Sequence, residues 1–186
     1  MAIKTPREFQ YFCETRHDIE CNQRYGNGKP YSYHLSMVAD TVTRFKDILP
    51  DEDSYVIAYC GAWGHDLIED ARFTYNDIKF ITKIKGENGR ILGEDIAEVI
   101  YACTEEKGRN RAERHSAKFF SDLKQNKLGV FVKLCDVISN VTESKNTGHG
   151  MFKKYQKEYP KLKENLYLKE YDKLFVELET LLEIGN

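Results

Sequence analysis

The chain has 186 residues, of which 41% are hydrophobic and 31% charged, a balance typical of one folded globular domain. Its 28 lysines and arginines against 30 aspartates and glutamates give a formal charge of −2, which argues against a broadly basic nucleic-acid-binding surface. The sequence has neither a stretch that could span a bilayer nor the apolar core of a signal peptide. We therefore expect a cytoplasmic protein, with neither a membrane nor a nucleic acid as its partner.

Helical periodicity of the apolar residues dominates almost the whole chain and predicts an all-α fold. Thr5 followed by Pro6 is typical of a helix start. Residues 23–30 contain two glycines and a proline, which predicts a loop, and Thr74 or Asn76 is expected to cap a short helix. The periodicity places the longer helices over residues 32–49, 53–70, 94–104, 112–126, 128–146 and 160–184.

The five cysteines are widely spaced and form no CxxC pair, which argues against a disulfide framework and against a thiolate zinc site. Four of them lie within apolar helical patterns, where free cysteine usually behaves as a small core residue. These four are Cys13, Cys60, Cys103 and Cys135.

An apolar helix, AYCGAWGHDLIED, ends in a group of ionisable residues that includes His65 and Asp66. Residues four apart share a helix face, so a continuous helix stacks His65 under Glu69 and Asp66 under Asp70. A solvated helix end accounts for the same residues about equally well, because charged side chains are common there.

Two further ionisable residues stand among apolar neighbours, His34 in YSYHLSMVAD and Asp136 in VFVKLCDVISNV. A lone histidine in such a helix is more often a core residue than a ligand, but a buried carboxylate must be paired, hydrogen-bonded or metal-bound. Together with the His-Asp pair they form a mixed nitrogen and oxygen set, which suits Mn²⁺, Fe²⁺ or Zn²⁺ better than Ca²⁺. A metal held this way lowers the pKa of its bound water, and the two carboxylates after the His-Asp pair would be placed to orient or deprotonate that water.

These blocks resemble the HD-domain phosphohydrolases, whose signature is H…HD…D on a helical scaffold, and more narrowly the hydrolase domain of the RelA/SpoT enzymes. RYGNGKPYSYHLSMVA is similar to that family's loop-to-helix segment, HDLIED to its H-D-x-x-E-D box, and VKLCDVISNV to its V-K-L-A-D-x-x-x-N motif. The resemblance covers about residues 20–145. It implies that residues 1–186 form a single HD domain, a helical bundle on which C-terminal helices within residues 148–184 pack.

The resemblance also implies an activity, the metal-dependent hydrolysis of the 3′-pyrophosphate of (p)ppGpp to GDP or GTP and pyrophosphate. It implies one Mn²⁺, with Zn²⁺ or Fe²⁺ as alternatives, and a small-molecule nucleotide as the substrate. The implied residues are His34, His65, Asp66 and Asp136 as metal ligands, Glu69 and Asp70 for water activation, and Arg24 and Asn140 for nucleotide contacts. Because the chain ends where a synthetase domain would begin, we expect it to resemble the stand-alone small alarmone hydrolases, such as the metazoan SpoT homologues.

Three alternatives stay open at this point: the same chemistry on (p)ppApp, another HD nucleotide phosphohydrolase such as a 5′-nucleotidase or dNTP hydrolase, and a binding module without catalysis. Leu35, Val137 and Ser139 depart from the family pattern, and we expect these departures to affect the nucleotide pocket more than the metal site.

The roles of several other polar residues are less clearly indicated by the sequence. The basic segment from Lys107 to Arg114 is either a lid that faces phosphate groups or a solvated helix start. Lys133 either supports the neighbouring Asp136 or covers the helix surface. His149 is expected in a solvated loop, and the pattern assigns no role to His17 or His115.

Overall fold

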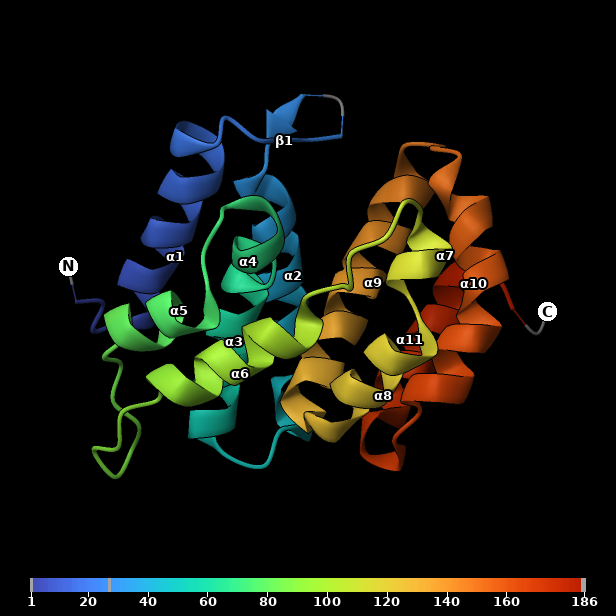
Figure 1. Cartoon of the computed structure of the whole chain (residues 1–186). Coiled ribbons are helices and arrows are strands. Elements are labelled where there is room, and N and C mark those ends of the chain that lie inside the picture. The colour runs from blue at the N-terminus through green and yellow to red at the C-terminus, as the bar shows by residue number, and fades with distance from the viewer. Residues whose placement is uncertain (1, 27, 185–186) are drawn as a thin grey trace.

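The computed structural model describes residues 2–26 and 28–184, and it confirms the all-α class (Figure 1). The α-helices are α1 (Pro6–Glu14), α2 (Ser32–Arg44), α3 (Glu52–Gly64), α4 (Leu67–Asp70), α5 (Tyr75–Ile81), α6 (Gly93–Cys103), α7 (Arg111–Arg114), α8 (Ala117–Gln125), α9 (Lys127–Asn146), α10 (Met151–Leu166) and α11 (Asp172–Leu182). The other elements are a π-helix (Thr15–Glu20), 3-10 helices (Lys46–Ile48 and Lys169–Tyr171) and the antiparallel strands β1 (Arg24–Tyr25) and β2 (Lys29–Pro30).

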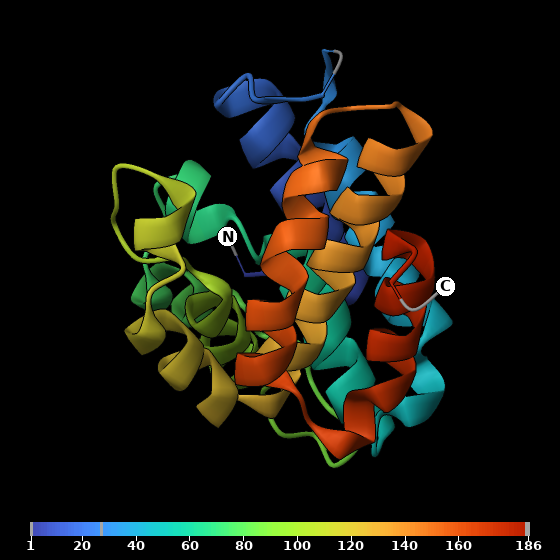
Figure 2. The ribbon, with the colours of Figure 1, turned by 90° about the vertical axis from the view of Figure 1, so that its right-hand side faces the viewer.

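The centre of the bundle is α9, whose residues 129–139 are all buried. It packs against α2, α3 and α6 and also against α8, α10 and α11. In Figure 1 it stands between the N-terminal helices and the orange and red C-terminal helices, and Figure 2 shows α10 alongside it. A polar side chain that is buried without a hydrogen-bond or charge partner costs free energy. A polar side chain in the buried stretch of α9 therefore needs a partner inside the protein.

Two glycines allow α3 to approach its neighbours closely. A Cβ atom on Gly61 would lie 2.6 Å from Cγ1 of Val99 on α6, and one on Gly64 would lie 2.6 Å from Cδ1 of Ile100. Both distances are too short for real side chains, so this close approach of α3 and α6 requires glycine. The end of α3, which carries His65, is thereby fixed against the core.

The prediction of one continuous helix over residues 53–70 was wrong. The helix α3 ends at Gly64, and α4 starts at Leu67. Nδ1 of His65 donates a hydrogen bond to the carbonyl oxygen of Ala62 at 2.8 Å. In a continuous helix this carbonyl would accept from the backbone N–H of Asp66, so the imidazole replaces a helical hydrogen bond at the turn.

Other helix boundaries also differ from the prediction. Ser116 caps α8 by accepting from the backbone N–H of Phe119 at 3.1 Å, which separates α7 from α8 within residues 112–126. The pattern over residues 160–184 belongs to two helices, because the backbone is extended at Leu168, between α10 and α11. The first of these helices, α10, starts earlier than predicted and contains Pro160. Residues 45–49 form a 3-10 turn instead of the last turn of α2.

The capping predictions at the N-terminal ends hold. Thr5 accepts from the backbone N–H of Glu8, with Pro6 in the first turn of α1, and Thr74 rather than Asn76 caps α5. All five cysteines lie in the described part of the chain and are free, and the four in apolar patterns are buried. Among the described residues, no helix combines the length and the apolar character needed to cross a membrane. The helices α10 and α11 contact α9, but that residues 1–186 form a single domain stays a prediction.

Candidate metal centre

Four side chains from three parts of the chain converge beside α9. His34 comes from the first turn of α2, His65 and Asp66 from the turn between α3 and α4, and Asp136 from the middle of α9. His34, His65 and Asp136 are buried, with 3%, 2% and 6% of their surface exposed. Each of His34, His65 and Asp66 offers one donor atom, and these atoms lie within 4.8 Å of one another.

The spacing of the donor atoms fits one metal ion. The distance between Nε2 of His34 and Nε2 of His65 is 3.3 Å, and Oδ2 of Asp66 lies 2.9 Å from Nε2 of His65. Oδ1 of Asp136 lies 3.3 Å from Nε2 of His34 and 3.9 Å from Nε2 of His65. Atoms bound to one ion at about 2.0–2.2 Å stand about 2.8–3.6 Å apart at neighbouring tetrahedral or octahedral positions. The four side chains therefore need little movement to bind a common ion.

The hydrogen bond between His65 and Ala62 also fits metal binding. Because the carbonyl of Ala62 can only accept, the proton of the neutral imidazole is on Nδ1, and Nε2 faces His34 and Asp66 with a free lone pair. A hydrogen bond from the second ring nitrogen to a carbonyl is the usual way in which proteins orient a metal-binding histidine.

Both carboxylates of the cluster are ionised. Burial disfavours the charged form of Asp66, but His65 and His34 hold its pKa well below the usual range. Burial acts in the same direction on Asp136, and Lys133 together with His34 holds its pKa well below the usual range. In the ion-free protein, burial lowers the pKa of His65, but the charges of Asp66 and Asp136 outweigh it and raise this pKa to about 9. A cation would replace the proton that these two carboxylates attract.

A second set of polar groups orients the carboxylates. The hydroxyl of Tyr31 donates to Oδ2 of Asp66 at 2.5 Å. Nδ2 of Asn140 donates to Oδ1 of Asp136 at 2.6 Å, and the hydroxyl of Tyr25 donates to the amide oxygen of Asn140 at 2.8 Å. The sequence pattern suggested that a tyrosine near Arg24 stacks on a base, but it did not predict these hydrogen bonds of Tyr25 and Tyr31. The signal for them was the excess of tyrosine in the sequence segment 25–33, which contains Tyr25, Tyr31 and Tyr33.

Lys133 belongs to the cluster and does not cover the helix surface. Only 9% of its side chain is exposed, and Nζ lies 3.2 Å from Oδ2 of Asp136. Burial lowers the pKa of Lys133, but the charges of Asp136 and Glu105 raise it above its usual value. The lysine thus neutralises one side of Asp136, and the other oxygen of this carboxylate faces the two histidines.

Glu69 and Asp70 are exposed residues of α4, and the turn at residues 65–66 interrupts the continuous helix predicted to stack them on the His-Asp pair, although the backbone N–H of Asp70 still donates to the carbonyl oxygen of Asp66 at 2.9 Å. The turn at residues 65–66 redirects α4, and Oε1 of Glu69 accepts from the backbone N–H of Glu105 at 2.6 Å. Oδ2 of Asp70 accepts from the amide of Gln23 at 2.7 Å. Although Glu69 is exposed, partial desolvation by its neighbours raises the pKa of its carboxyl, which brings it nearer to the neutral range where a proton acceptor works best.

A cavity of about 370 Å³ adjoins the cluster on the side of Asn140. Tyr25, Asn140, Glu143, His149 and Tyr155 are among its lining residues. The ring of Tyr25 also stacks on the ring of His34, with 4.8 Å between the centroids and 14° between the planes. The cavity and the candidate metal centre therefore share a wall. His149 is exposed, as expected of a loop residue, but lies at this cavity.

Arg24 lies on the exposed β-hairpin, where Nη2 donates to the side chain of Asn22 at 2.9 Å. The residues that depart from the family pattern lie elsewhere. Leu35, Val137 and Ser139 are buried, with 0%, 7% and 3% of their surface exposed, and their effect on the nucleotide pocket stays a prediction.

The basic segment carries ion pairs that the sequence pattern did not predict. Nε of Arg111 lies 2.9 Å from Oε2 of Glu158, and Nε of Arg114 lies 3.3 Å from Oε2 of Glu105. Lys107 and Arg109 are exposed. Half of the segment's positive charge is thus paired with glutamates.

Two histidines without a predicted role are buried and have polar partners. Nδ1 of His17 lies 2.7 Å from the side-chain oxygen of Gln23, the residue whose amide contacts Asp70. Nε2 of His115 lies 2.6 Å from Oε1 of Glu105. Their roles depend on contacts between distant parts of the chain, which helical periodicity does not show.

No protein-family model matches this chain, and no curated protein matches its sequence. Among the solved structures, the chain is similar to that of a metazoan ortholog of SpoT that hydrolyzes ppGpp and plays a role in starvation responses. The two structures superpose with a TM-score of 0.72 at 18% sequence identity, and the match covers 96% of this chain and 93% of the other. This likeness shows that the two proteins share the same helical fold.

Proposed function

We propose that this chain hydrolyses the 3′-pyrophosphate of (p)ppGpp, giving GDP or GTP and pyrophosphate, in a reaction that depends on one divalent cation. The observation that carries the proposal is the convergence of His34, His65, Asp66 and Asp136, whose donor atoms have the spacing of one metal site. The ppGpp-hydrolysing protein with the same fold supports the choice of substrate.

The four converging side chains would hold Mn²⁺, and the same donor set also suits Zn²⁺ or Fe²⁺. The ion, when bound, makes water more acidic and polarises a phosphoryl oxygen. Asn140 keeps Asp136 directed at the histidines, and Tyr31 does the same for Asp66. These hydrogen bonds lower the cost of assembling the site, because the carboxylates are already oriented before the cation binds.

The chemistry needs a proton acceptor close to the attacking water. The water oxygen forms a bond to the phosphorus atom carried by the ribose 3′-oxygen, the bond between that phosphorus and the 3′-oxygen breaks, and the 3′-oxygen takes up a proton. In this proposal Glu69 and Asp70 orient the water, and one of these two carboxylates takes its proton. The raised pKa of Glu69 favours this residue as the group that exchanges the proton.

The cavity beside the cluster is the proposed site of the nucleoside. Its volume of about 370 Å³ and its two aromatic rings, Tyr25 and Tyr155, suit a base and a sugar. Asn140 stands between the cavity and Asp136, where it can contact the ribose and its 3′-phosphate. Arg24, next to Tyr25 on the hairpin, is the proposed contact to the rest of the nucleotide.

A turnover panel tests this proposal. The full chain is incubated with ppGpp, pppGpp, ppApp, deoxynucleoside triphosphates and nucleoside monophosphates, each with Mn²⁺, Mg²⁺ or Zn²⁺. We expect pyrophosphate from the guanosine 3′-pyrophosphates with Mn²⁺. Turnover of ppApp alone would favour the adenine substrate, and turnover of only the triphosphates or monophosphates would replace the proposal with another HD phosphohydrolase.

Variants connect the activity to the cluster. Asp66→Ala is expected to abolish turnover, and the matched control Asp40→Ala, which changes an exposed aspartate on α2, is expected to retain it. A folded Asp66→Ala protein with full activity would refute the assignment of the site. Metal retained by the wild-type chain without any turnover would instead favour a binding module.

A further inference from the structure

Glu105 contacts both Glu69, a proposed proton acceptor, and Lys133, which is paired with the proposed ligand Asp136. Glu105 itself is neither a proposed ligand nor a proposed proton acceptor. It follows the end of α6, two residues after Cys103, and only 9% of its side chain is exposed. Its backbone N–H donates to Oε1 of Glu69 at 2.6 Å, and its carboxylate lies on the opposite side, toward α9. One residue thus reaches both a carboxylate of α4 and the cluster on α9.

Nitrogen atoms of three basic side chains lie close to the carboxylate of Glu105. Nε2 of His115 lies 2.6 Å from Oε1, Nε of Arg114 lies 3.3 Å from Oε2, and Nζ of Lys133 lies 3.4 Å from Oε1. Two hydrogen-bond partners, His115 and Lys133, and the ion pair with Arg114 fix this mostly buried carboxylate more firmly than one surface ion pair could.

Lys133 is the link from Glu105 to the metal ligands. Its ammonium lies between Oε1 of Glu105 at 3.4 Å and Oδ2 of Asp136 at 3.2 Å. Glu105 therefore shares the positive charge of Lys133. Without that second carboxylate, the ammonium would pair with Asp136 alone and compete with a cation for its negative charge.

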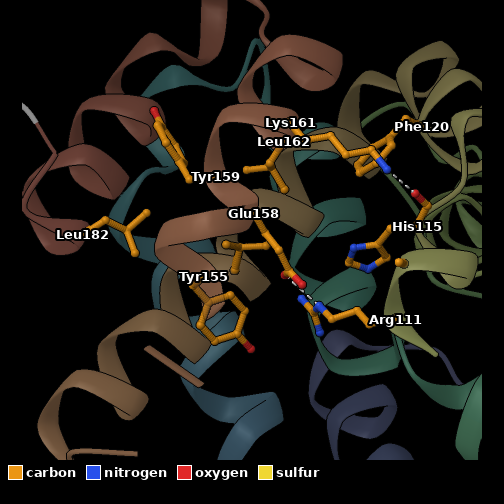
Figure 3. A pocket seen from close by; sticks show the side chains of 11 residues that line it. Arg111, His115, Phe120, Tyr155, Glu158, Tyr159, Lys161, Leu162 and Leu182 are labelled. Carbon is orange, nitrogen blue, oxygen red and sulfur yellow. Dashed lines mark hydrogen bonds and ion pairs between the residues drawn. The ribbon is translucent and has the colours of Figure 1, made fainter. Parts of the chain in front are cut away.

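The segment that follows Glu105 is also bound to α10 by polar contacts. Figure 3 shows Arg111 directed at Glu158 of α10, and Lys161 of α10 directed at the backbone of His115. The nitrogen-to-oxygen distances are 2.9 Å in both contacts. A cavity of about 110 Å³ adjoins this segment and α10, and these two polar contacts bridge the segment to α10 beside it.

We propose that Glu105 is a positioning residue of the metal centre, which holds Lys133 between two carboxylates and fixes Glu69 through its backbone N–H. The inference rests on the proposed function for the role of Glu69, but its effect on cation binding is independent of the substrate.

The test measures Mn²⁺ binding to the full-length chain by electron paramagnetic resonance, with the variant Glu105→Gln. The next residue is a matched control, because Glu106 is also a glutamate but contacts Ser116 and Lys118 instead of the cluster. Loss of a group that supports metal ligands typically costs about 10- to 100-fold in metal affinity or activity. We expect Glu105→Gln to weaken Mn²⁺ binding by about that factor and Glu106→Gln to leave it unchanged, with both proteins folded by circular dichroism.

A second comparison separates positioning through Lys133 from a general loss of structure. In a Lys133→Met background the ammonium is absent, so Glu105→Gln should cause much less further loss of Mn²⁺ affinity. An equal loss in both backgrounds, or an unchanged affinity in Glu105→Gln alone, would overturn the proposal.

The readouts also separate this inference from the proposed function. Mn²⁺ binding that depends on Glu105, without turnover of any nucleotide, would support the inference and refute the function. If the chain hydrolyses ppGpp and Glu105→Gln changes neither the Mn²⁺ affinity nor kcat, the proposed function is supported and the inference about Glu105 is refuted.

Discussion

The hydrogen bond from Tyr31 to Asp66 offers a sharp test of how the metal ligands are oriented. The donor and acceptor oxygens are 2.5 Å apart, and the acceptor is the oxygen that also faces His65. Tyr31→Phe removes the hydroxyl and keeps the ring, so the packing of the aromatic side chain against His17 and His34 is preserved.

The expected magnitude follows from the charge on the acceptor. A hydrogen bond to a charged group contributes about 1.5–3 kcal/mol. If that energy orients Asp66 for the cation, its loss weakens Mn²⁺ binding by about 10- to 150-fold, since about 1.4 kcal/mol corresponds to a factor of ten. Calorimetric titration of the full chain with Mn²⁺ measures this ratio directly.

Tyr33 provides the matched control for this variant. It lies two residues further along the chain, and its hydroxyl donates to Glu143 at 3.1 Å, away from the converging ligands. Tyr33→Phe should keep the wild-type affinity for Mn²⁺. Equal affinities for the two variants would refute the reasoning, because the hydroxyl of Tyr31 would then contribute nothing to the metal centre.

Two further predictions concern the pH dependence of the site and the packing beneath it. Because its carboxylate neighbours raise the pKa of His65 to about 9, the ion-free site holds a proton at pH 7, and Mn²⁺ must displace it. Affinity should therefore rise with pH up to about 9, with proton release detectable by calorimetry in buffers of different ionisation enthalpy; a pH-independent affinity would contradict this. Gly61→Ala should destabilise the fold by about 1–3 kcal/mol through overpacking against Val99, measured by urea unfolding. Gly150→Ala meets open space and should unfold like the wild type, and equal stabilities of the two variants would refute the packing argument.

The helical class and the positions of the four converging side chains were accessible from the sequence for a physical reason. His34 and Asp136 stand among apolar residues, and a buried polar group needs partners, so the pattern indicated that they meet others inside the bundle. Helical periodicity also located α9, because its apolar run is long and uninterrupted by glycine or proline in its centre.

The end of α3 and the positions of Tyr31 and Glu105 could not be predicted from the sequence pattern. The end of α3 at Gly64 depends on the imidazole of His65 taking the carbonyl of Ala62, a contact that competes with a helical hydrogen bond of similar strength. The positions of Tyr31 and Glu105 depend on which helices pack together across the chain. Local propensity and spacing carry no information on those long-range contacts, so they could not reveal either residue.

The central claim is that one divalent cation, held by the converging histidines and aspartates, enables this chain to release pyrophosphate from ppGpp. The most direct test is a titration of the chelator-treated full chain with Mn²⁺, with the rate of pyrophosphate formation from ppGpp measured at each step. We expect the rate to rise to a plateau at one equivalent of Mn²⁺ per chain, and to stay at background for Asp136→Asn. A folded chain that binds Mn²⁺ but forms no pyrophosphate from ppGpp at any point of the titration would contradict the claim.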